Sequence, residues 1–302
     1  MKLIPACWGV LLIASTVVAA DLESALKNLK DAEARKDVAL VKKLAAETSA
    51  QARQVLAAPQ PDNDEAIELW KQRQDYAREV DGYTEYALYA AAVQSPPAQL
   101  IDLIDSLERQ NPKSKYLDDA WARYLVALHQ TGAASKIPEV AAHAIANFPD
   151  NEDLLLVLAD NALAKQQNDR ALAYSERLIA ALNKHARPEW IPAADWERKR
   201  SAALGRGYWI AGVMHAGRNQ YFEADRDLRG ALPLIKGNEA MMAAALFHLG
   251  VVNYQLGRMT MNKGQVLEGV KFSEQAAALP GSLQGQAWRN AQVMKSEAAK
   301  MR

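Results

Sequence analysis

The side chains best suited to bind a metal ion or to transfer a proton are five histidines, which lie far apart in the sequence. They are His129, His143, His185, His215 and His248. None belongs to an H-E-x-x-H motif, and none has a carboxylate at the spacing of a helical zinc site. The sequence therefore favours histidines that pack inside the protein or lie on its surface, and it predicts no metal and no cofactor.

Acidic residues occur in close pairs, as hydrolysis by two carboxylates would require. The pairs are Asp102 and Asp105, Asp118 and Asp119, and Asp225 and Asp227. Such chemistry also needs carboxylates that converge across a cleft and differ in environment. These pairs are neighbours near predicted helix starts or on polar helix faces, which gives no sign of convergence.

The sequence also lacks the usual nucleophile and phosphate-binding motifs. The single cysteine, Cys7, lies near the N-terminus, and no G-x-S-x-G motif occurs. The stretch GRGYWIAG (205–212) contains glycines, but it lacks the G-x-G-x-x-G spacing and follows no predicted strand. The sequence predicts a protein that is not an enzyme. A hydrolase or small-molecule binder with residues 184–202 as a lid is the alternative from another class.

The composition is that of a globular protein without net charge. The chain has 302 residues, of which 50% are hydrophobic and 24% are charged. Lys and Arg together number 36, and so do Asp and Glu, so no overall field attracts nucleic acid or an anionic membrane. We therefore expect no nucleic-acid partner.

The first residues, MKLIPACWGVLLIASTVVAA (1–20), are typical of a secretory signal peptide. Lys2 precedes an apolar run from Leu3 to Val18, and small residues end the segment at Ala20. We expect cleavage after Ala20 and export to the periplasm. An uncleaved membrane anchor and acylation at Cys7 are the alternatives, and membrane contact is expected only if the segment is retained.

The rest of the chain carries the pattern of helices. Apolar residues recur at intervals of three and four, and strong helix formers dominate, which predicts an all-α fold. Residues 21–58 form one long helix or a helix pair, which PQPDND (59–64) ends. A second long helix is expected over about 65–93, ended by SPP (95–97).

Large and small residues recur with a period of 34 in the second half of the chain. One set is Trp121, Tyr124, Leu125, Leu128, Gly132, Ile137, Ala141 and Ala144, and the next is Leu155, Leu158, Ala159, Ala162, Ala171 and Leu178. Similar sets begin at Tyr208 and Leu246. A period of this length is typical of stacked helical hairpins.

This pattern resembles the tetratricopeptide repeat family. The stretch LFHLGVVNYQLGR (246–258) holds two Leu-Gly pairs and a tyrosine, as the first helix of such a repeat does. The resemblance implies that Gly212 and Gly250 lie where two helices cross, and that Gly257 caps the end of a helix. It also implies a tetratricopeptide-like solenoid of helical hairpins, a right-handed superhelix, preceded by a long N-terminal helical hairpin.

These ranges define the expected domains. A signal peptide over 1–20 precedes an N-terminal helical hairpin over 21–80 and a solenoid over 81–302. Clear repeats are expected at about 118–151, 152–185, 205–238 and 243–280. An insertion is expected at 184–202 and a capping helix at 283–301.

In a tetratricopeptide solenoid, the first helices of the repeats line a concave groove. The residues that the resemblance places there are Tyr89, Val126, His129, Asp160, Leu163, Trp209, Val213, Phe247, Val251 and Tyr254. Aromatic side chains give a large contact area at low entropic cost. The alternative is that several of them pack against residues 184–202, which include Trp190 and Trp196. The carboxylate clamp of chaperone-binding relatives is not matched.

The sequence as a whole favours an exported, non-catalytic scaffold that binds a protein or peptide partner in this groove. The alternative is a membrane-tethered subunit that resembles the repeat-containing lipoproteins of outer-membrane assembly. Its N-terminus would be acylated Cys7 or uncut Met1 in place of Asp21.

Overall fold

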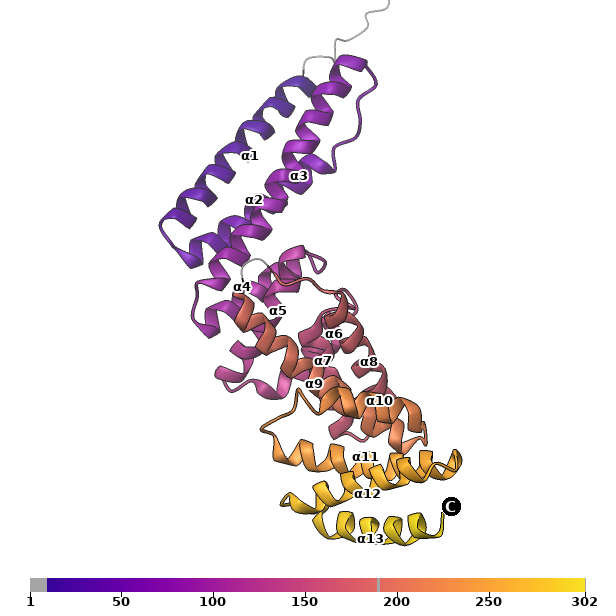
Figure 1. The fold of residues 1–302 in the computed structure, drawn as a ribbon. Coiled ribbons are helices and arrows are strands. Elements are labelled where there is room, and N and C mark those ends of the chain that lie inside the picture. The colour runs from indigo at the N-terminus through magenta and orange to yellow at the C-terminus, as the bar shows by residue number, and fades with distance from the viewer. Residues whose placement is uncertain (1–9, 189–190, 302) are drawn as a thin grey trace, which may run out of the picture. The chain divides into compact units, whose positions relative to one another are not determined.

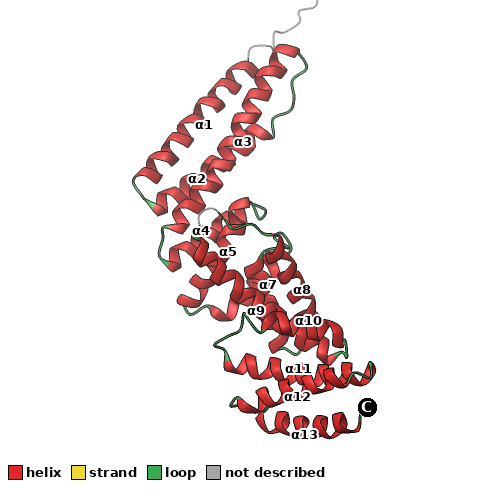
Figure 2. Cartoon of the chain, viewed as in Figure 1, coloured by secondary structure: helices red, strands yellow, loops and turns green. Residues whose placement is uncertain are grey.

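Helices are the only regular secondary structure in the part of the chain that the computed structural model describes, residues 10–188 and 191–301 (Figure 2). The predicted all-α class is confirmed. The chain forms two compact units, which join between Ile137 and Pro138.

The N-terminal unit contains five long helices (Figure 1). They are α1 (Val10–Ala34), α2 (Val38–Leu56), α3 (Asp64–Val93), α4 (Pro97–Gln110) and α5 (Lys115–Gln130), followed by the short 3-10 helix η1 (Ala134–Lys136). Residues 21–58 therefore form a helix pair, and the predicted break near 59–64 lies between α2 and α3. The boundary expected between residues 80 and 81 lies inside α3, which continues without interruption.

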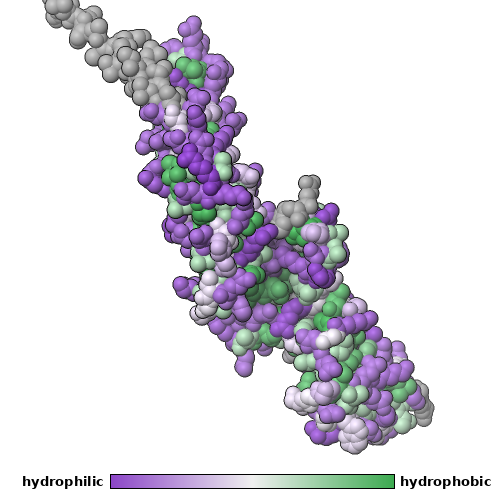
Figure 3. Space-filling model, turned by 90° about the vertical axis from the view of Figure 1, so that its left-hand side faces the viewer, coloured by the Kyte–Doolittle hydropathy of each residue, from purple (hydrophilic) through white to green (hydrophobic). Residues whose placement is uncertain are grey.

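Helices α1, α2 and α3 pack on one another in the N-terminal unit. Their shared core contains Leu22, Ala52, Ala77 and Val80, so each helix buries an apolar face against the other two. Hydrophilic residues cover most of the face of this unit that Figure 3 shows, and the apolar residues there form small, separate patches. Helix α4 packs on α3, and α5 packs on both α3 and α4.

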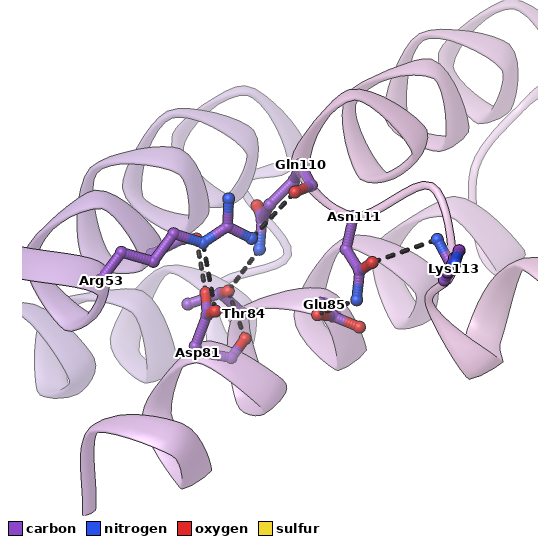
Figure 4. A network of polar contacts seen from close by, with 8 residues as sticks. Arg53, Asp81, Thr84, Glu85, Gln110, Asn111 and Lys113 are labelled. Atoms are coloured by element: carbon purple, nitrogen blue, oxygen red, sulfur yellow. Dashed lines mark hydrogen bonds and ion pairs between the residues drawn. The ribbon is translucent and has the colours of Figure 1, made fainter. Parts of the chain in front are cut away.

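A polar network joins α2, α3 and α4 (Figure 4). Arg53 donates from Nε to Asp81 Oδ2 (3.2 Å) and from Nη2 to the backbone carbonyl of Gln110 (2.8 Å). Asn111 Nδ2 donates to Glu85 Oε1 (2.8 Å). Polar groups at the end of α4, which a helix end leaves without partners inside the helix, thus gain hydrogen bonds. Asp81 and Glu85 of α3 each accept a hydrogen bond in this network.

The C-terminal unit contains eight helices in its described residues, arranged mostly as pairs. They are α6 (Ile137–Ala144), α7 (Glu152–Ala164), α8 (Asn168–Lys184), α9 (Ala193–Gly217), α10 (Tyr221–Ala231), α11 (Glu239–Met259), α12 (Lys263–Ala278) and α13 (Gln284–Lys300). Helix α7 packs on α8, α9 on α10, and α11 on α12, and the second helix of each pair packs on the next pair or on α13.

The expected repeats at 152–185, 205–238 and 243–280 each fall on one of these pairs, but the pair at 205–238 begins earlier than expected. Helix α9 starts at Ala193, so residues 193–202 of the expected insertion form its first turns. Pro192 immediately precedes the helix, a position that suits its fixed backbone angle.

Five helix-to-helix turns share one backbone geometry. Each contains a single residue with positive φ, and these are Lys36, Gly132, Gln166, Asn219 and Met261. In each turn, the amide of the following residue donates to the carbonyl five positions earlier, at 2.8–3.1 Å. This 6→1 bond is that of the Schellman motif, which satisfies carbonyls at the end of a helix. Gly132 and Gln166 lie 34 positions apart, which is the period of the sequence pattern.

Gly257 does not cap α11, contrary to the sequence prediction. The helix continues to Met259, and the left-handed residue of the turn is Met261. A Cβ on Gly257 would lie 2.7 Å from the backbone nitrogen of Val266 on α12. This glycine therefore permits a close approach of two helices.

Replacing Gln166 or Met261 with glycine is expected to raise the free energy of unfolding by about 0.5–1 kcal/mol per site. Both residues have a left-handed backbone, which is unfavourable for a side chain with Cβ and is freely accessible to glycine. Urea denaturation followed by circular dichroism measures the change. Gly132→Ala in the equivalent turn is the control and should lower stability. Equal losses at all three sites would contradict the assigned turn geometry.

Candidate functional site

Helices α7, α9 and α11 form one layer of the C-terminal unit and carry most of the expected groove residues. Helix α9 contacts both α7 and α11, and α11 also contacts α13. In the described chain, no two of α8, α10 and α12 come into comparable contact. Asp160 and Leu163 lie on α7, and Trp209 and Val213 lie on α9. Phe247, Val251 and Tyr254 lie on α11. We call the helices α7, α9 and α11 the first layer.

Contacts of Arg206 and Trp209 on α9 connect the three helices of the first layer. Arg206 Nε on α9 donates to Asp160 Oδ1 on α7 at 2.7 Å. The guanidinium carbon of Arg206 lies 4.8 Å from the centroid of the Trp209 ring. Trp209 Nε1 in turn donates to the backbone carbonyl of Met241 on α11 at 3.0 Å. Trp209 and Asp160 therefore help to hold the layer together, and the half-buried indole ring leaves part of its surface accessible.

The other expected residues of the first layer differ in exposure. Phe247 is only 9% exposed and packs in a cluster that includes Ala287 of α13, so it belongs mainly to the core. Val213 and Val251 are partly buried against neighbouring clusters. Tyr254 is half-buried, and the guanidinium carbon of Arg258 lies 5.6 Å from its ring centroid. Surface suited to contact a partner is thus provided by parts of Trp209, Val213, Val251 and Tyr254.

The remaining three expected residues lie in the N-terminal unit. Val126 is 56% exposed on α5, and His129 is also exposed near the end of that helix. Tyr89 on α3 is half-buried and stacks on Tyr116 at the start of α5, with ring centroids 5.5 Å apart and an interplanar angle of 24°.

Tyr89 belongs to a larger aromatic group that the sequence prediction missed. Tyr83, Tyr86 and Tyr89 follow one another at intervals of three on α3, and therefore share one helix face. The Tyr86 ring lies 5.8 Å from that of Tyr83 and 5.9 Å from that of Tyr116. We call these four residues the tyrosine row. The spacing within YTEYALY (83–89) is the sequence signal that could have revealed it.

The hydroxyl groups of Tyr83 and Tyr89 stay protonated at neutral pH. Burial raises the pKa of Tyr83, and its hydrogen bond to Glu33 Oε2 (2.5 Å) and the charge of that carboxylate raise it further. Burial also raises the pKa of Tyr89, with a smaller contribution from Asp119 that Arg123 partly opposes.

Several residues that could have done chemistry have structural partners instead. His185 Nδ1 lies 3.3 Å from Glu152 Oε2, and His215 Nδ1 lies 2.9 Å from Gln220 Oε1. Burial lowers the pKa of His248, which favours its neutral form. Within residues 10–188 and 191–301, no group of three or more His, Cys, Asp or Glu side chains could hold a metal ion.

The acidic pairs also form ion pairs and hydrogen bonds with side chains of their own unit. Asp102 pairs with Lys42 of α2, and Asp105 accepts a hydrogen bond from Tyr124 of α5 (2.6 Å). Asp225 pairs with Arg229 at 2.8 Å, and Asp227 is buried and pairs with Arg226 at the same distance. These four carboxylates therefore take part in contacts within and between helices.

Residues 184–202 run from the end of α8 into the first turns of α9. Ion pairs of Lys199 join these first turns of α9 to α7. Trp196 is buried on α9, whereas Trp190 lies outside the described residues. Lys199 Nζ contacts Glu152 Oε1 (3.0 Å) and Asp153 Oδ2 (2.6 Å) on the first turn of α7.

An open hollow of about 480 Å³ lies elsewhere in the C-terminal unit, between the segment that joins α10 to α11 and the helices α11 and α12. It is lined by Leu232, Pro233, Lys236, Met242, Leu246, Gln275, Ala278 and Leu279. Most of these side chains are apolar, and Lys236 and Gln275 are the polar ones among them.

None of the described helices combines the length and the apolar character needed to cross a membrane. No protein family model matches the sequence. Comparison with curated proteins finds no match, and comparison with solved structures finds none either.

Proposed function

We propose that this protein is an exported, non-catalytic scaffold of the tetratricopeptide type, which binds a segment of a partner protein on its first layer. In this proposal, the helical hairpins stack as a right-handed solenoid. The repeated Schellman turns and the 34-residue spacing of two of them support this architecture. Export is proposed from the signal-like segment 1–20. Of that segment, residues 1–9 lie outside the described residues, and α1 begins at Val10.

The contact pattern of the C-terminal unit is the observation that carries the binding proposal. Helix α9 contacts both α7 and α11, whereas no two of α8, α10 and α12 contact each other in the described residues. A stack whose helices lie closer together on one side curves toward that side. The first layer would therefore be concave, and concave surfaces bury more of a bound segment than flat ones do.

The test is chemical crosslinking in the envelope fraction of the source cell, using the chain from Asp21 and its Trp209→Ala/Tyr254→Ala variant. We expect a defined protein to be crosslinked to the unmodified chain and to fall at least about tenfold in the variant, because aromatic residues dominate binding energy. Recovery of the same proteins in equal amounts with both chains would refute the proposed surface.

Two further variants separate lost binding from lost packing. Trp209→Phe keeps most of the ring but removes the N–H that binds Met241, so it should retain more partner than Trp209→Ala. Trp288→Ala removes an exposed aromatic side chain on α13 and should leave the partner unchanged. Circular dichroism establishes that each variant is folded.

A further inference from the structure

In the tyrosine row, the Tyr86 ring is inclined to both of its ring neighbours, so the row is not flat around Tyr86. The plane of the Tyr86 ring makes an angle of 51° with that of Tyr83 and of 58° with that of Tyr116. Rings that touch at such angles leave a wedge-shaped gap on their open side. Tyr86 is 41% exposed, so part of its side chain is accessible to a ligand. Sugars and nucleobases stack on flat ring faces, whereas the compact ring of proline fits a furrow between aromatic side chains.

The dimensions of the row suit a polyproline II helix. The two gaps share the Tyr86 ring, and the centroid distances across them are 5.8 and 5.9 Å, so their midpoints lie no more than about 6 Å apart. Two residues of a polyproline II chain span a similar length, at about 3.1 Å per residue. With three residues per turn, two of the three edges of such a helix can rest on a surface together.

Unused hydrogen-bond donors accompany the furrows. A polyproline II chain makes no internal hydrogen bonds, so its carbonyl groups need external donors. The Tyr83 hydroxyl already donates to Glu33. No hydrogen bond links the hydroxyl of Tyr86 or Tyr116 to another described residue, so both can donate to a ligand.

Two lysines add positive charge to the row. Lys30 Nζ lies 5.0 Å from the ring centroid of Tyr83, and Lys115 Nζ lies 5.1 Å from that of Tyr116. Neither ammonium group forms an ion pair with a carboxylate of the described chain. Acidic residues in a ligand would therefore meet a positive charge at both places, although the Glu33 carboxylate bound to Tyr83 opposes part of the attraction at Lys30.

We propose that the tyrosine row binds a proline-rich segment of a partner protein, in the polyproline II conformation and with acidic residues on both sides of the prolines. The tilted rings provide the furrows, Tyr86 and Tyr116 provide donors, and Lys30 and Lys115 provide the charge. This surface is separate from the first layer of the C-terminal unit, and its binding does not depend on the function proposed for that layer.

Fluorescence anisotropy with a labelled synthetic peptide tests the proposal on the whole chain. The probe contains an uninterrupted run of prolines flanked by glutamates. We expect saturable binding that is lost when glycines replace the prolines, since a glycine chain must first be ordered. We also expect Tyr86→Ala/Tyr116→Ala to weaken it at least about tenfold, as removal of aromatic anchors does. Phe222→Ala, an exposed aromatic site of the C-terminal unit, is the matched control and should bind normally.

The charge is tested separately with Lys30→Gln/Lys115→Gln. This variant should bind a few-fold more weakly at low salt, and the difference should shrink as ionic strength rises. If the double tyrosine variant does not fold, Tyr86→Ala alone serves, because this side chain is partly exposed. Equal binding of the glycine peptide, absence of binding to the unmodified chain, or binding of a β-linked oligosaccharide in its place would overturn the proposal.

Discussion

Replacing Gly269 with alanine is expected to lower the free energy of unfolding by about 3 kcal/mol, near the upper end for overpacked sites. The added Cβ would lie 2.7 Å from the backbone carbonyl oxygen of Gly250 and 2.9 Å from the backbone nitrogen of Tyr254. Both atoms belong to α11, so neither can move aside by a side-chain rotation. The whole of α11 would have to shift relative to α12.

Gly82→Ala is the matched control, because this glycine also lies inside a helix. No atom lies within 4 Å of a Cβ added there. Alanine is a better helix former than glycine, so this variant should gain up to about 1 kcal/mol. Urea denaturation of both variants measures the contrast. A loss at Gly269 no larger than about 0.5 kcal/mol would show that α11 and α12 do not approach as closely as described.

Gly250 provides an internal test of the same crossing. A Cβ there would meet Ser273 Oγ, and it would also lie 3.2 Å from the backbone oxygen of Gly269. Ser273→Ala removes the closest atom, so it should relieve part of the loss caused by Gly250→Ala. It should give no relief to Gly269→Ala, whose close contacts are all with backbone.

The crossing glycines could be predicted from the sequence because their spacing expresses a local rule of helix packing. The repeat pattern placed Gly212 and Gly250 where helices cross, and the structure agrees. A Cβ on Gly212 would lie 2.6 Å from Leu228 Cγ on α10. The position of a small residue at a helix crossing can be predicted from the sequence of that one hairpin, without knowledge of the rest of the chain. The all-α class was predictable for the same reason.

Features that depend on distant parts of the chain were not predictable in this way. Phe247 was expected in a groove, but it is buried in a cluster that includes Ala287 of α13, and the pattern of one helix gives no information about such packing. Lys36, Gln166 and Met261 have left-handed backbones although their types disfavour that conformation. The residue type alone therefore does not indicate these turns. Tyr89 was identified, whereas Tyr116 was missed because it comes from another helix.

Replacing Lys199 with methionine is expected to lower the free energy of unfolding by about 2 kcal/mol at neutral pH. Methionine keeps the length and apolar stem of lysine but removes the ammonium group that contacts Glu152 and Asp153. The side chain of Glu152 is 12% exposed and that of Lys199 is 32% exposed, so the pair is partly shielded from water. His185 remains as a weaker partner of Glu152, which limits the loss.

The effect depends on pH with a definite sign. Burial alone would raise the pKa of Glu152, but the charge of Lys199, its hydrogen bond and the helix backbone outweigh burial and hold that pKa below its ordinary value of 4.5. A carboxylate with a depressed pKa stabilises the fold above its ordinary pKa, and this contribution is lost as the pH falls through the folded-state value. In Lys199→Met, burial is no longer balanced, so Glu152 should take up its proton at a higher pH.

The difference in stability between the two proteins should therefore be largest near neutral pH. It should shrink as the pH falls through the pKa of Glu152 in the variant and then through its lower pKa in the unmodified protein. Urea denaturation at several pH values measures it. Lys295→Met is the control, since Lys295 and its partner Glu274 are both about half exposed and such pairs contribute little. A constant difference across this pH range would mean that Lys199 acts through its packing and not through its charge.

Amide hydrogen exchange would show where this loss of stability is located. Lys199 joins the extra first turns of α9 to the start of α7, whereas the rest of α9 packs on α8 and α10. Faster exchange confined to the start of α9 would mean that the ion pairs anchor only this extension. Faster exchange through α7 and α8 as well would mean that the extension stabilises the neighbouring hairpin. We expect faster exchange only at the start of α9. The apolar core shared by α7, α8 and α9 contains residues such as Ala159, Leu172 and Ile210. The variant loses none of the contacts in this core, so the neighbouring hairpin should keep its stability.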